Sequence, residues 1–319
     1  MRLAIVFALL PLSAMADARV DAALDQSILP GFAHLSDATS ALAASDDCAP
    51  VDAWAQASDA WQAVSHLRFG PTEVDNRGFA LAYWPDPRGA TPKALNTLLS
   101  DHAPAVADAS VAGRGFYAME FLLFDPAYPP SDARCALVHA LAQDAHATAI
   151  AITQDWNDRY APLLSDPTNA TYQSETEALQ ELYKALQTGL EFDSDTRIGR
   201  PLGSFDHPRA TRAEMRRSGR SLNNVVVSLT SLQQLAHALA LEDVALTAEI
   251  DAAFDVAFAR ADEIAQIDGG ADFSFVDDPQ NRLKLEVLQQ NIDSIRDLLA
   301  MKLGPQLGVS AGFNSLDGD

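Results

Sequence analysis

The chain has 319 residues, of which 48% are hydrophobic and 21% charged, so it holds enough apolar material for one large core or two medium ones. Its 44 acidic and 22 basic residues give a net charge of -22, which would repel a nucleic-acid backbone or an anionic membrane surface. Those two partners are therefore excluded, and 16 glycines with two cysteines also exclude collagen-like and disulfide-scaffold proteins.

Residues 1–16 have the pattern of a secretory signal peptide. Arg2 is followed by an apolar run from Leu3 to Leu12 and by the cleavage motif Ala14-Met15-Ala16. The apolar run is too short to cross a bilayer, and no later segment lacks charges for the length required. No cysteine follows the cleavage site, so no direct membrane anchor is expected. We predict a periplasmic protein whose mature chain begins near Asp17.

The two cysteines of the chain are Cys48 and Cys135. An oxidising compartment permits a disulfide between them, since only one pairing exists. The alternative is two separate buried thiols.

Helical periodicity continues along the chain. Apolar residues recur at steps of three and four from Trp54 to Val64, from Leu222 to Leu239 and from Leu285 to Leu299. Asp132 and Ser174 are expected as N-caps of two further helices. Outside these stripes we expect helices over residues 19–44, 132–164, 172–191 and 243–266.

These long helices and their irregular connections predict an all-α fold of two helical bundles packed against each other. A break near Asp166-Pro167 would divide the mature chain into an N-terminal bundle over residues 17–165 and a C-terminal bundle over 166–319. No run of alternating apolar residues indicates a sheet.

Glu120 is the one ionisable carboxylate in the apolar segment from Gly115 to Phe124. On a helix it would touch Phe116 and Tyr117 behind it and apolar residues ahead. A carboxylate removed from water is costly unless it is protonated, paired with a cation or hydrogen-bonded. Glu120 therefore predicts a partner from elsewhere in the molecule.

Arginines provide an obvious supply of such partners. Seven of the 22 basic residues lie between Arg197 and Arg220, and Arg77 flanks an earlier irregular stretch. Four arginines are expected on one helical face: Arg209, Arg212, Arg216 and Arg220. In one interpretation these guanidiniums hold two acidic bundles together. In the other, some converge with Glu120 on a pocket for an anionic or metal-chelating ligand.

Six ordered segments resemble the imelysin family of exported all-helical proteins, also described as imelysin-like peptidases or insulin-cleaving metalloproteases. The resemblance covers about residues 20–319 and implies two bundles with a site at their junction. It also suggests that Asn314 or Asp317 docks near this junction; the alternative is that this tail caps the last helix. The matching segments are 61–71 (WQAVSHLRFGP), 76–77 (NR), 83–89 (YWPDPRG), 115–124 (GFYAMEFLLF), 217–223 (RSGRSLN) and 312–319 (GFNSLDGD).

The family motif Gly-x-His-x-x-Glu is matched by Gly115 and Glu120, but Tyr117 stands at the histidine position. A neutral imidazole binds zinc readily, whereas a phenol must first lose its proton. Zinc peptidase chemistry is therefore disfavoured. A ferric ion held by Glu120 and Tyr117, or a ligand without metal, remains open.

Together these observations predict a binding protein that takes a metal ion (iron or zinc) or a small anionic metal chelate at the junction of the bundles. The resemblance connects this function with iron acquisition and suggests an iron-uptake membrane component as partner. A metallopeptidase and a non-catalytic structural module are the alternatives. The expected ligand-binding residues are Glu120, Tyr117, Arg77, Arg217, Ser218, Arg220 and Asp317.

Overall fold

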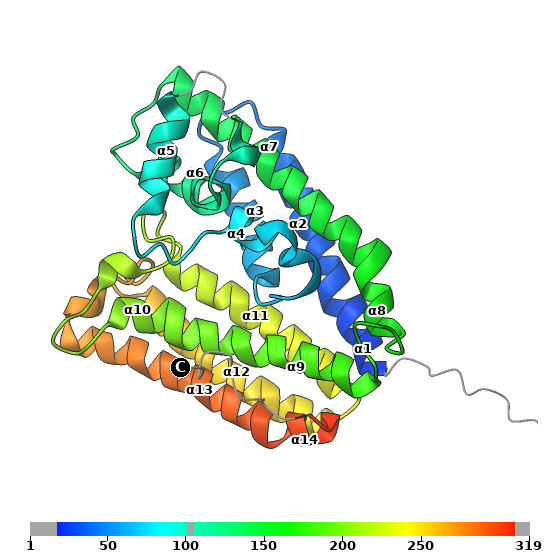
Figure 1. The fold of residues 1–319 in the computed structure, drawn as a ribbon. Helices are drawn as coiled ribbons and strands as arrows, with labels where there is room; N and C mark the ends of the chain where they lie inside the picture. The colour runs from blue at the N-terminus through cyan, green and yellow to red at the C-terminus, as the bar shows by residue number, and fades with distance from the viewer. Residues whose placement is uncertain (1–17, 101–104, 310–319) are drawn as a thin grey trace, which may run out of the picture.

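The computed structural model describes residues 18–100 and 105–309, and these residues form helices and connecting segments without a β-strand (Figure 1). The predicted all-α fold of two packed helical bundles is confirmed. The predicted signal peptide and the motif Gly312–Asp319, with its expected site residue Asp317, lie outside the described residues.

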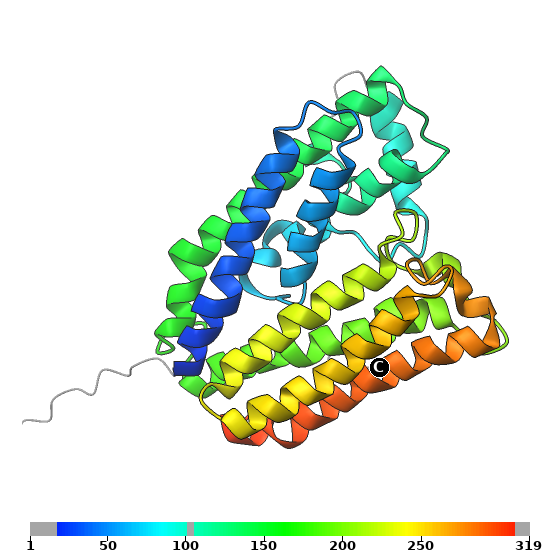
Figure 2. The same ribbon diagram turned by 180° about the vertical axis from the view of Figure 1, so that it is seen from behind.

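Two long helical stretches form the body of the N-terminal bundle and lie side by side in both views (Figures 1 and 2). Each contains a π-helical turn that continues into the next helix, and α3 packs beside the first of them. The elements are α1 (Ala18–Ala23), η1 (Leu24–Ile28), α2 (Leu29–Ala43), α3 (Val51–Val64), α7 (Asp132–Asp155), η6 (Trp156–Tyr160) and α8 (Ala161–Ser165).

Shorter elements cover the other side of α3 and α7. Among them α6 carries apolar and aromatic side chains on every side, with Glu120 as its one charged residue, and is largely buried. These elements are η2 (Gly70–Thr72), η3 (Val74–Asn76), α4 (Arg77–Leu81), α5 (Ala90–Ser100), η4 (Val106–Asp108), η5 (Val111–Gly113) and α6 (Gly115–Phe124).

Four long helices form the C-terminal bundle: α9, α11, α12 and α13 (Figure 2). Helices α9 and α11 contact the N-terminal bundle, whereas α12 and α13 pack on their far side. The predicted boundary at residues 165 and 166 falls between α8 and α9, and the division into two domains there stays a prediction. The elements are α9 (Glu175–Glu191), η7 (Phe192–Ile198), α10 (Gly199–Leu202), η8 (Ala210–Arg212), α11 (Ser221–Ala240), α12 (Val244–Ala265), η9 (Ser274–Asp277), α13 (Pro279–Met301) and α14 (Leu303–Leu307).

The continuous helix over Asp132–Ser165 is the one described helix that is long and apolar enough to cross a bilayer, by length and composition alone. Leu137, Leu141 and Ile152 on this helix are fully or almost fully buried in the core of the protein. It therefore packs as a core helix against α2.

Two local predictions are corrected and one is confirmed. Ser174 caps α9 through the backbone N–H of Glu177, as predicted. The cap of α7 is Ser131 rather than Asp132, because the Ser131 hydroxyl accepts the N–H of Arg134. The four arginines from 209 to 220 do not share a helical face, because η8 and the turns that follow it bring the chain to α11.

Cys48 and Cys135 form a disulfide across 87 positions. It joins the segment between α2 and α3 to the first turn of α7, and so closes the end of the N-terminal bundle that lies away from α9. Of the two open alternatives, the disulfide is the one observed.

Candidate functional site

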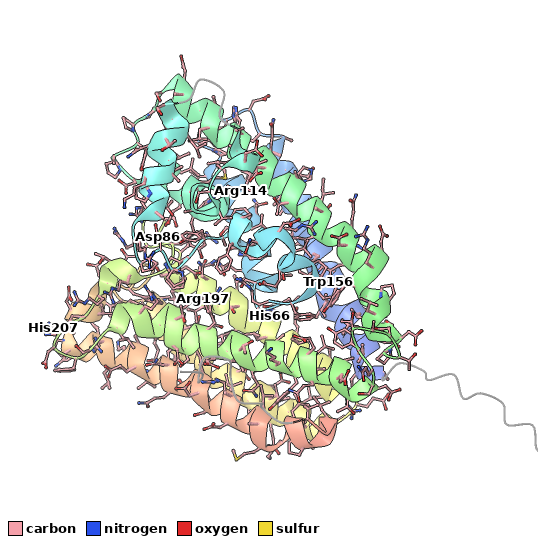
Figure 3. The ribbon with its side chains drawn as sticks, viewed as in Figure 1. His66, Asp86, Arg114, Trp156, Arg197 and His207 are labelled. Atoms are coloured by element: carbon pink, nitrogen blue, oxygen red, sulfur yellow. A yellow bond between two sulfur atoms is a disulfide. The ribbon has the colours of Figure 1, made fainter. Side chains whose placement is uncertain are left out.

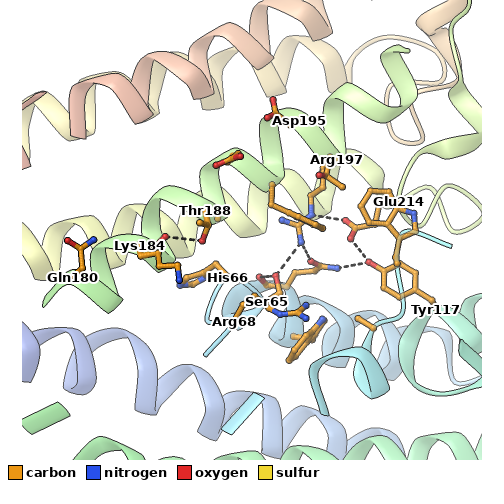
Figure 4. Close-up of a pocket in the computed structure, with 18 residues that line it drawn as sticks. Ser65, His66, Arg68, Tyr117, Gln180, Lys184, Thr188, Asp195, Arg197 and Glu214 are labelled. Atoms are coloured by element: carbon orange, nitrogen blue, oxygen red, sulfur yellow. Dashed lines mark hydrogen bonds and ion pairs between the residues drawn. The ribbon is translucent and has the colours of Figure 1, made fainter. Parts of the chain in front are cut away.

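A cavity of about 700 Å³ lies where the two bundles meet (Figure 4). Its walls come from the C-terminal part of α3, the segment around Trp84, the inner side of α9 and η7, and two single residues, Tyr117 and Glu214. Both bundles contribute, so the cavity exists only once they have packed. Figure 3 places Arg197 and His66 in this junction.

Arg197 is the centre of a buried ionic network at one wall. It is 3% exposed and sits in the π-helical turn η7, a geometry that is frequent at functional sites. Its guanidinium donates to the carboxylates of Asp193 and Glu214, with Nε 2.9 Å from Glu214 Oε2. Further donations go to three residues that hold it from other helices: Gln62, Ser65 and Ser228.

Tyr117 joins this network from α6, because its hydroxyl donates a hydrogen bond to the carboxylate of Glu214. Burial, followed by the negative charge of Glu214, raises the pKa of Tyr117 well above its ordinary value. The phenol therefore stays protonated. Glu214 also accepts from Asn224 at 2.9 Å, so three side chains donate to this carboxylate.

The network holds one buried cation and two buried carboxylates. Burial raises the pKa of Asp193 to about 6, although Arg197 opposes the shift, and Asp193 Oδ2 has no hydrogen-bond partner among the described residues. Burial acts against the charge of Arg197 as well, but Glu214 and Asp193 together raise its pKa above the ordinary value. Arg197 is therefore charged, while the carboxyl of Asp193 holds its proton to a higher pH than an ordinary aspartate does.

His66 lies beside the network, just after α3, and is 5% exposed. Neither ring nitrogen has a hydrogen-bond partner among the described residues. Burial, and then the charge of Arg197, lowers the pKa of His66 to about 3, so the ring is neutral. Gly189 allows α9 to approach this closely, because a Cβ there would lie 2.8 Å from the Cβ of His66 and 2.6 Å from Leu232.

Trp84 and Phe192 form an apolar side of the cavity, which Trp61 and Tyr117 also line. Trp84 and Phe192 meet edge to face with centroids 6.0 Å apart, and the guanidinium of Arg197 lies 4.9 Å from the Phe192 ring. Lys184, on the exposed rim, forms no ion pair with the described residues. The cavity thus has an aromatic side, a polar wall whose residues around Arg197 are hydrogen-bonded to one another, and at its rim Lys184, which is not paired with a described carboxylate.

Glu120 is buried, as its apolar neighbours predict, and is 2% exposed. Its carboxylate accepts the backbone N–H of Ser218 at 3.0 Å and the Ser218 hydroxyl at 2.9 Å. Burial raises the pKa of Glu120, and the two bonds from Ser218 oppose that rise. Glu120 and Ser218 are thus brought together, but neither lines the cavity.

The predicted arginines form ion pairs elsewhere. Arg217 contacts Asp125 at 2.8 Å and lies 3.6 Å from the centre of the Phe121 ring. Arg220 pairs with Asp59 of α3. Both pairs connect the segment before α11 to the N-terminal bundle, as the interpretation of arginines as links between bundles expects.

Arg77 pairs with Asp155 at 2.6 Å, inside the N-terminal bundle. Of the expected ligand-binding residues that the structure describes, Tyr117 is the one that lines the cavity.

Tyr117 and Glu120 do not fit a metal ion in this arrangement. Tyr117 keeps its proton and donates a hydrogen bond to Glu214, while Glu120 already accepts two hydrogen bonds from Ser218. Within the described residues, one group of three neighbouring metal-ligating side chains exists, Cys48, Cys135 and His139. Both its sulfurs are in the disulfide, and metal binding requires thiolates.

Sequence reasoning missed His66 and most of the residues that bond within the network around Arg197: Gln62, Ser65, Asp193, Glu214, Asn224 and Ser228. One available signal was the spacing of Asp193 and Arg197, opposite charges four residues apart, which meet on one face of a helix. His66 lies inside the segment WQAVSHLRFGP, but nothing in that segment indicates that its ring lacks a partner among the described residues.

Comparison with known proteins gives one family and similar folds. The family model for Imelysin matches residues 23–299. No curated protein sequence matches the chain.

Two solved structures share the fold. An imelysin-like protein from Psychrobacter arcticum 273-4 has 18% identity and a TM-score of 0.75, over 94% of this chain and all (100%) of that one. A protein from Parabacteroides distasonis ATCC 8503, described as a putative iron-regulated protein A precursor, has 14% identity and a TM-score of 0.66, over 88% of this chain and 94% of that one.

Proposed function

This chain belongs to the imelysin family, and from that premise we propose that it is an exported binding protein that takes a small anionic metal chelate into the cavity between its bundles. By binding such a chelate, the protein would take part in iron acquisition. Delivery of the ligand to an iron-uptake membrane component is part of the same proposal.

The cavity at the junction carries the proposal. Its volume of about 700 Å³ lies within the range of ligand sites for small organic molecules, which are usually concave, largely apolar and provided with a few polar groups. Trp84 and Phe192 supply the apolar side, and the network around Arg197 supplies a fixed polar wall. A protein whose bundles were merely fastened together would not need such a space.

The lining carries three cations and three carboxylates. Arg197 pairs with Glu214, and Glu191 pairs with Arg296. Lys184 and Arg68 remain to meet an anionic ligand, beside one exposed carboxylate, Asp195. Lys184 has no ion pair with the described residues. Arg68 pairs with Glu73 at 2.9 Å, but the two side chains are 38% and 45% exposed, and such surface pairs contribute little. Both cations can therefore turn to a ligand carboxylate at small cost.

We propose that the metal arrives inside an organic chelate and not as a bare ion held by protein ligands. Tyr117 keeps its proton, and Glu214 has its acceptor positions engaged by three donors. A chelator that surrounds the metal would ask the protein only for an aromatic surface, hydrogen bonds and a counter-charge, and the lining offers all three.

Binding is favoured over catalysis by the state of the same residues. A metallopeptidase needs a metal-bound water and a free general base beside it. Tyr117 and Glu214 are committed to each other, and Tyr117 replaces the histidine of the family motif.

Two observations away from the cavity support a role in iron acquisition and export from the cytoplasm. One protein with the same fold carries the description putative iron-regulated protein A precursor. The disulfide between Cys48 and Cys135 fits an oxidising compartment outside the cytoplasm. A periplasmic location and a cleaved signal peptide belong to the proposal.

The test is calorimetric titration of the oxidised, mature protein with ferric citrate, ferric 2,3-dihydroxybenzoate, the two metal-free acids, and zinc and ferric ions alone. We expect one site for at least one of the organic ligands. Trp84→Leu should weaken that binding at least tenfold, because it removes one of the aromatic rings on which the ligand would pack. Phe205→Leu is the matched control, since Phe205 is 67% exposed and outside the cavity.

Absence of binding by all of these ligands would overturn the proposal. So would binding that Trp84→Leu leaves unchanged. Cleavage of an unfolded polypeptide that needs zinc and stops with a chelator would favour the peptidase instead.

A further inference from the structure

His66 is a buried polar side chain whose two ring nitrogens are shielded from solvent and have no partner among the described residues. Buried polar groups in native proteins are almost always hydrogen-bonded, so an exception requires an explanation. An apolar side chain of similar size would fill this place at lower free energy.

The surroundings of His66 point to the cavity as the source of a partner. His66 lines the cavity, and the backbone of Gly189 on α9 lies against its Cβ. The terminal torsion of an imidazole is soft, so the ring can turn an edge toward the space it borders. Because the ring is neutral, it offers one donor and one acceptor.

Neighbouring groups define what else the ligand carries. Lys184 and Thr188 lie one turn apart on α9, and both line the cavity together with His66 (Figure 4). A carboxylate is the natural counterpart of Lys184. Trp84 and Phe192 present ring faces and edges, the surfaces on which a planar aromatic group packs best.

We propose that His66 is the residue that recognises the ligand, and that the ligand is an aromatic acid whose ring bears a hydroxyl or carbonyl group. This inference rests on the proposed function and specifies the organic part of the chelate. His66 bonds the hydroxyl or carbonyl oxygen, Lys184 pairs with the carboxylate, and the ring packs on Trp84 and Phe192.

The experiment compares His66→Leu, Lys184→Met and the control Phe205→Leu with the parent protein in titrations against 2,3-dihydroxybenzoate, catechol and citrate. His66→Leu should weaken 2,3-dihydroxybenzoate and catechol at least tenfold. Lys184→Met should weaken 2,3-dihydroxybenzoate but not catechol, which has no carboxylate. His66→Gln, which keeps a donor and an acceptor, should recover part of the loss.

Urea unfolding of the same variants at pH 7 separates recognition from packing. His66→Leu should unfold at the same or a higher urea concentration than the parent, because the ring has no bond to lose among the described residues. A clear fall in its midpoint would show that His66 is structural and would overturn the inference.

The two proposals fail in different ways. If the parent binds ferric citrate or citrate and His66→Leu binds them equally well, the binding function stands and the role of His66 is wrong. The same holds if the parent prefers citrate to both aromatic compounds. If the parent binds no probe at all, the proposed function fails and this inference fails with it.

Discussion

The hydroxyl of Tyr117 donates a hydrogen bond to the carboxylate of Glu214, 97 positions further along the chain. Through this bond α6 of the N-terminal bundle meets the turn before α11 at the wall of the cavity. The same carboxylate receives Arg197. Tyr117, which replaces the histidine of the family motif, is therefore a buried hydrogen-bond donor in the ionic network around Arg197.

Arg197→Met should destabilise the protein by about 3–5 kcal/mol, because it leaves Asp193 and Glu214 buried without their cation. Urea unfolding at pH 7 measures the loss. Arg159→Met is the control, since the Arg159 side chain is 79% exposed and should lose less than about 1 kcal/mol. Equal losses in the free energy of unfolding for the two variants would mean that the buried network does not stabilise the protein.

Asp193→Asn should change how stability depends on pH. The folded pKa of Asp193, about 6, lies above the reference value of 3.8, so the folded state binds the proton more tightly. The stability that this proton confers is fully present below pH 3.8 and is lost as the pH rises to about 6, by about 3 kcal/mol.

The amide that the substitution introduces cannot titrate, so the parent should lose stability relative to Asp193→Asn over that window. Urea midpoints measured from pH 4 to pH 7 for both proteins check this. Parallel curves would show that the carboxyl group keeps an ordinary pKa.

Comparison of the parent with His66→Leu should show the opposite pH dependence of stability. The folded pKa of His66, about 3, lies below the reference value of 6.5, so the unfolded chain takes up a proton that the folded protein refuses. The parent should lose about 5 kcal/mol relative to the variant as the pH falls from 6.5 to 3. Acid unfolding followed by circular dichroism gives the difference, and a constant gap would contradict the prediction.

In the parent the effects of His66 and Asp193 have opposite signs between about pH 4 and pH 6 and largely cancel. The single variants are therefore needed to reveal either one.

Gly115→Ala should be strongly destabilising, by about 3 kcal/mol or more. Gly115 has a φ of +68°, and a Cβ there would lie 2.1 Å from the carbonyl oxygen of Leu81, a backbone atom that cannot swing away. Gly89→Ala is the matched control, with φ of +60° and nothing within 4 Å, so only the backbone strain of about 1 kcal/mol applies. Similar melting temperatures for the two variants would exclude the close contact as the cause.

Removal of the disulfide by the double change Cys48→Ser and Cys135→Ser should cost about 2–5 kcal/mol, because the bond closes a long loop in the unfolded chain. Urea unfolding of the variant, and of the parent with and without a thiol reductant, measures this. Ligand binding should persist in the folded variant, since the bond lies outside the cavity. Loss of binding at a urea concentration where the variant remains folded would contradict that separation.

Local patterns were sufficient for the long helices, because a helix is decided by residues three and four positions apart, but they did not indicate α5. The stripe from Leu285 to Leu299 became the buried side of α13, and the apolar surroundings of Glu120 correctly predicted its burial. The arginines between 209 and 220 were misjudged because turns interrupt the segment, and an N-cap was misplaced by one residue at Ser131.

What the sequence determined by itself was the all-helical architecture, the family, and the burial of Glu120 in an apolar segment that also holds Tyr117, since each follows from neighbours along the chain. Only the tertiary structure decided which groups those side chains meet: Ser218 for Glu120 and Glu214 for Tyr117. It also decided that His66 finds no partner within the described part of the chain. The physical reason is that hydrogen bonds and ion pairs act over a few ångströms, and the packing of two bundles brings together residues that are 98 positions apart for the first pair and 97 for the second.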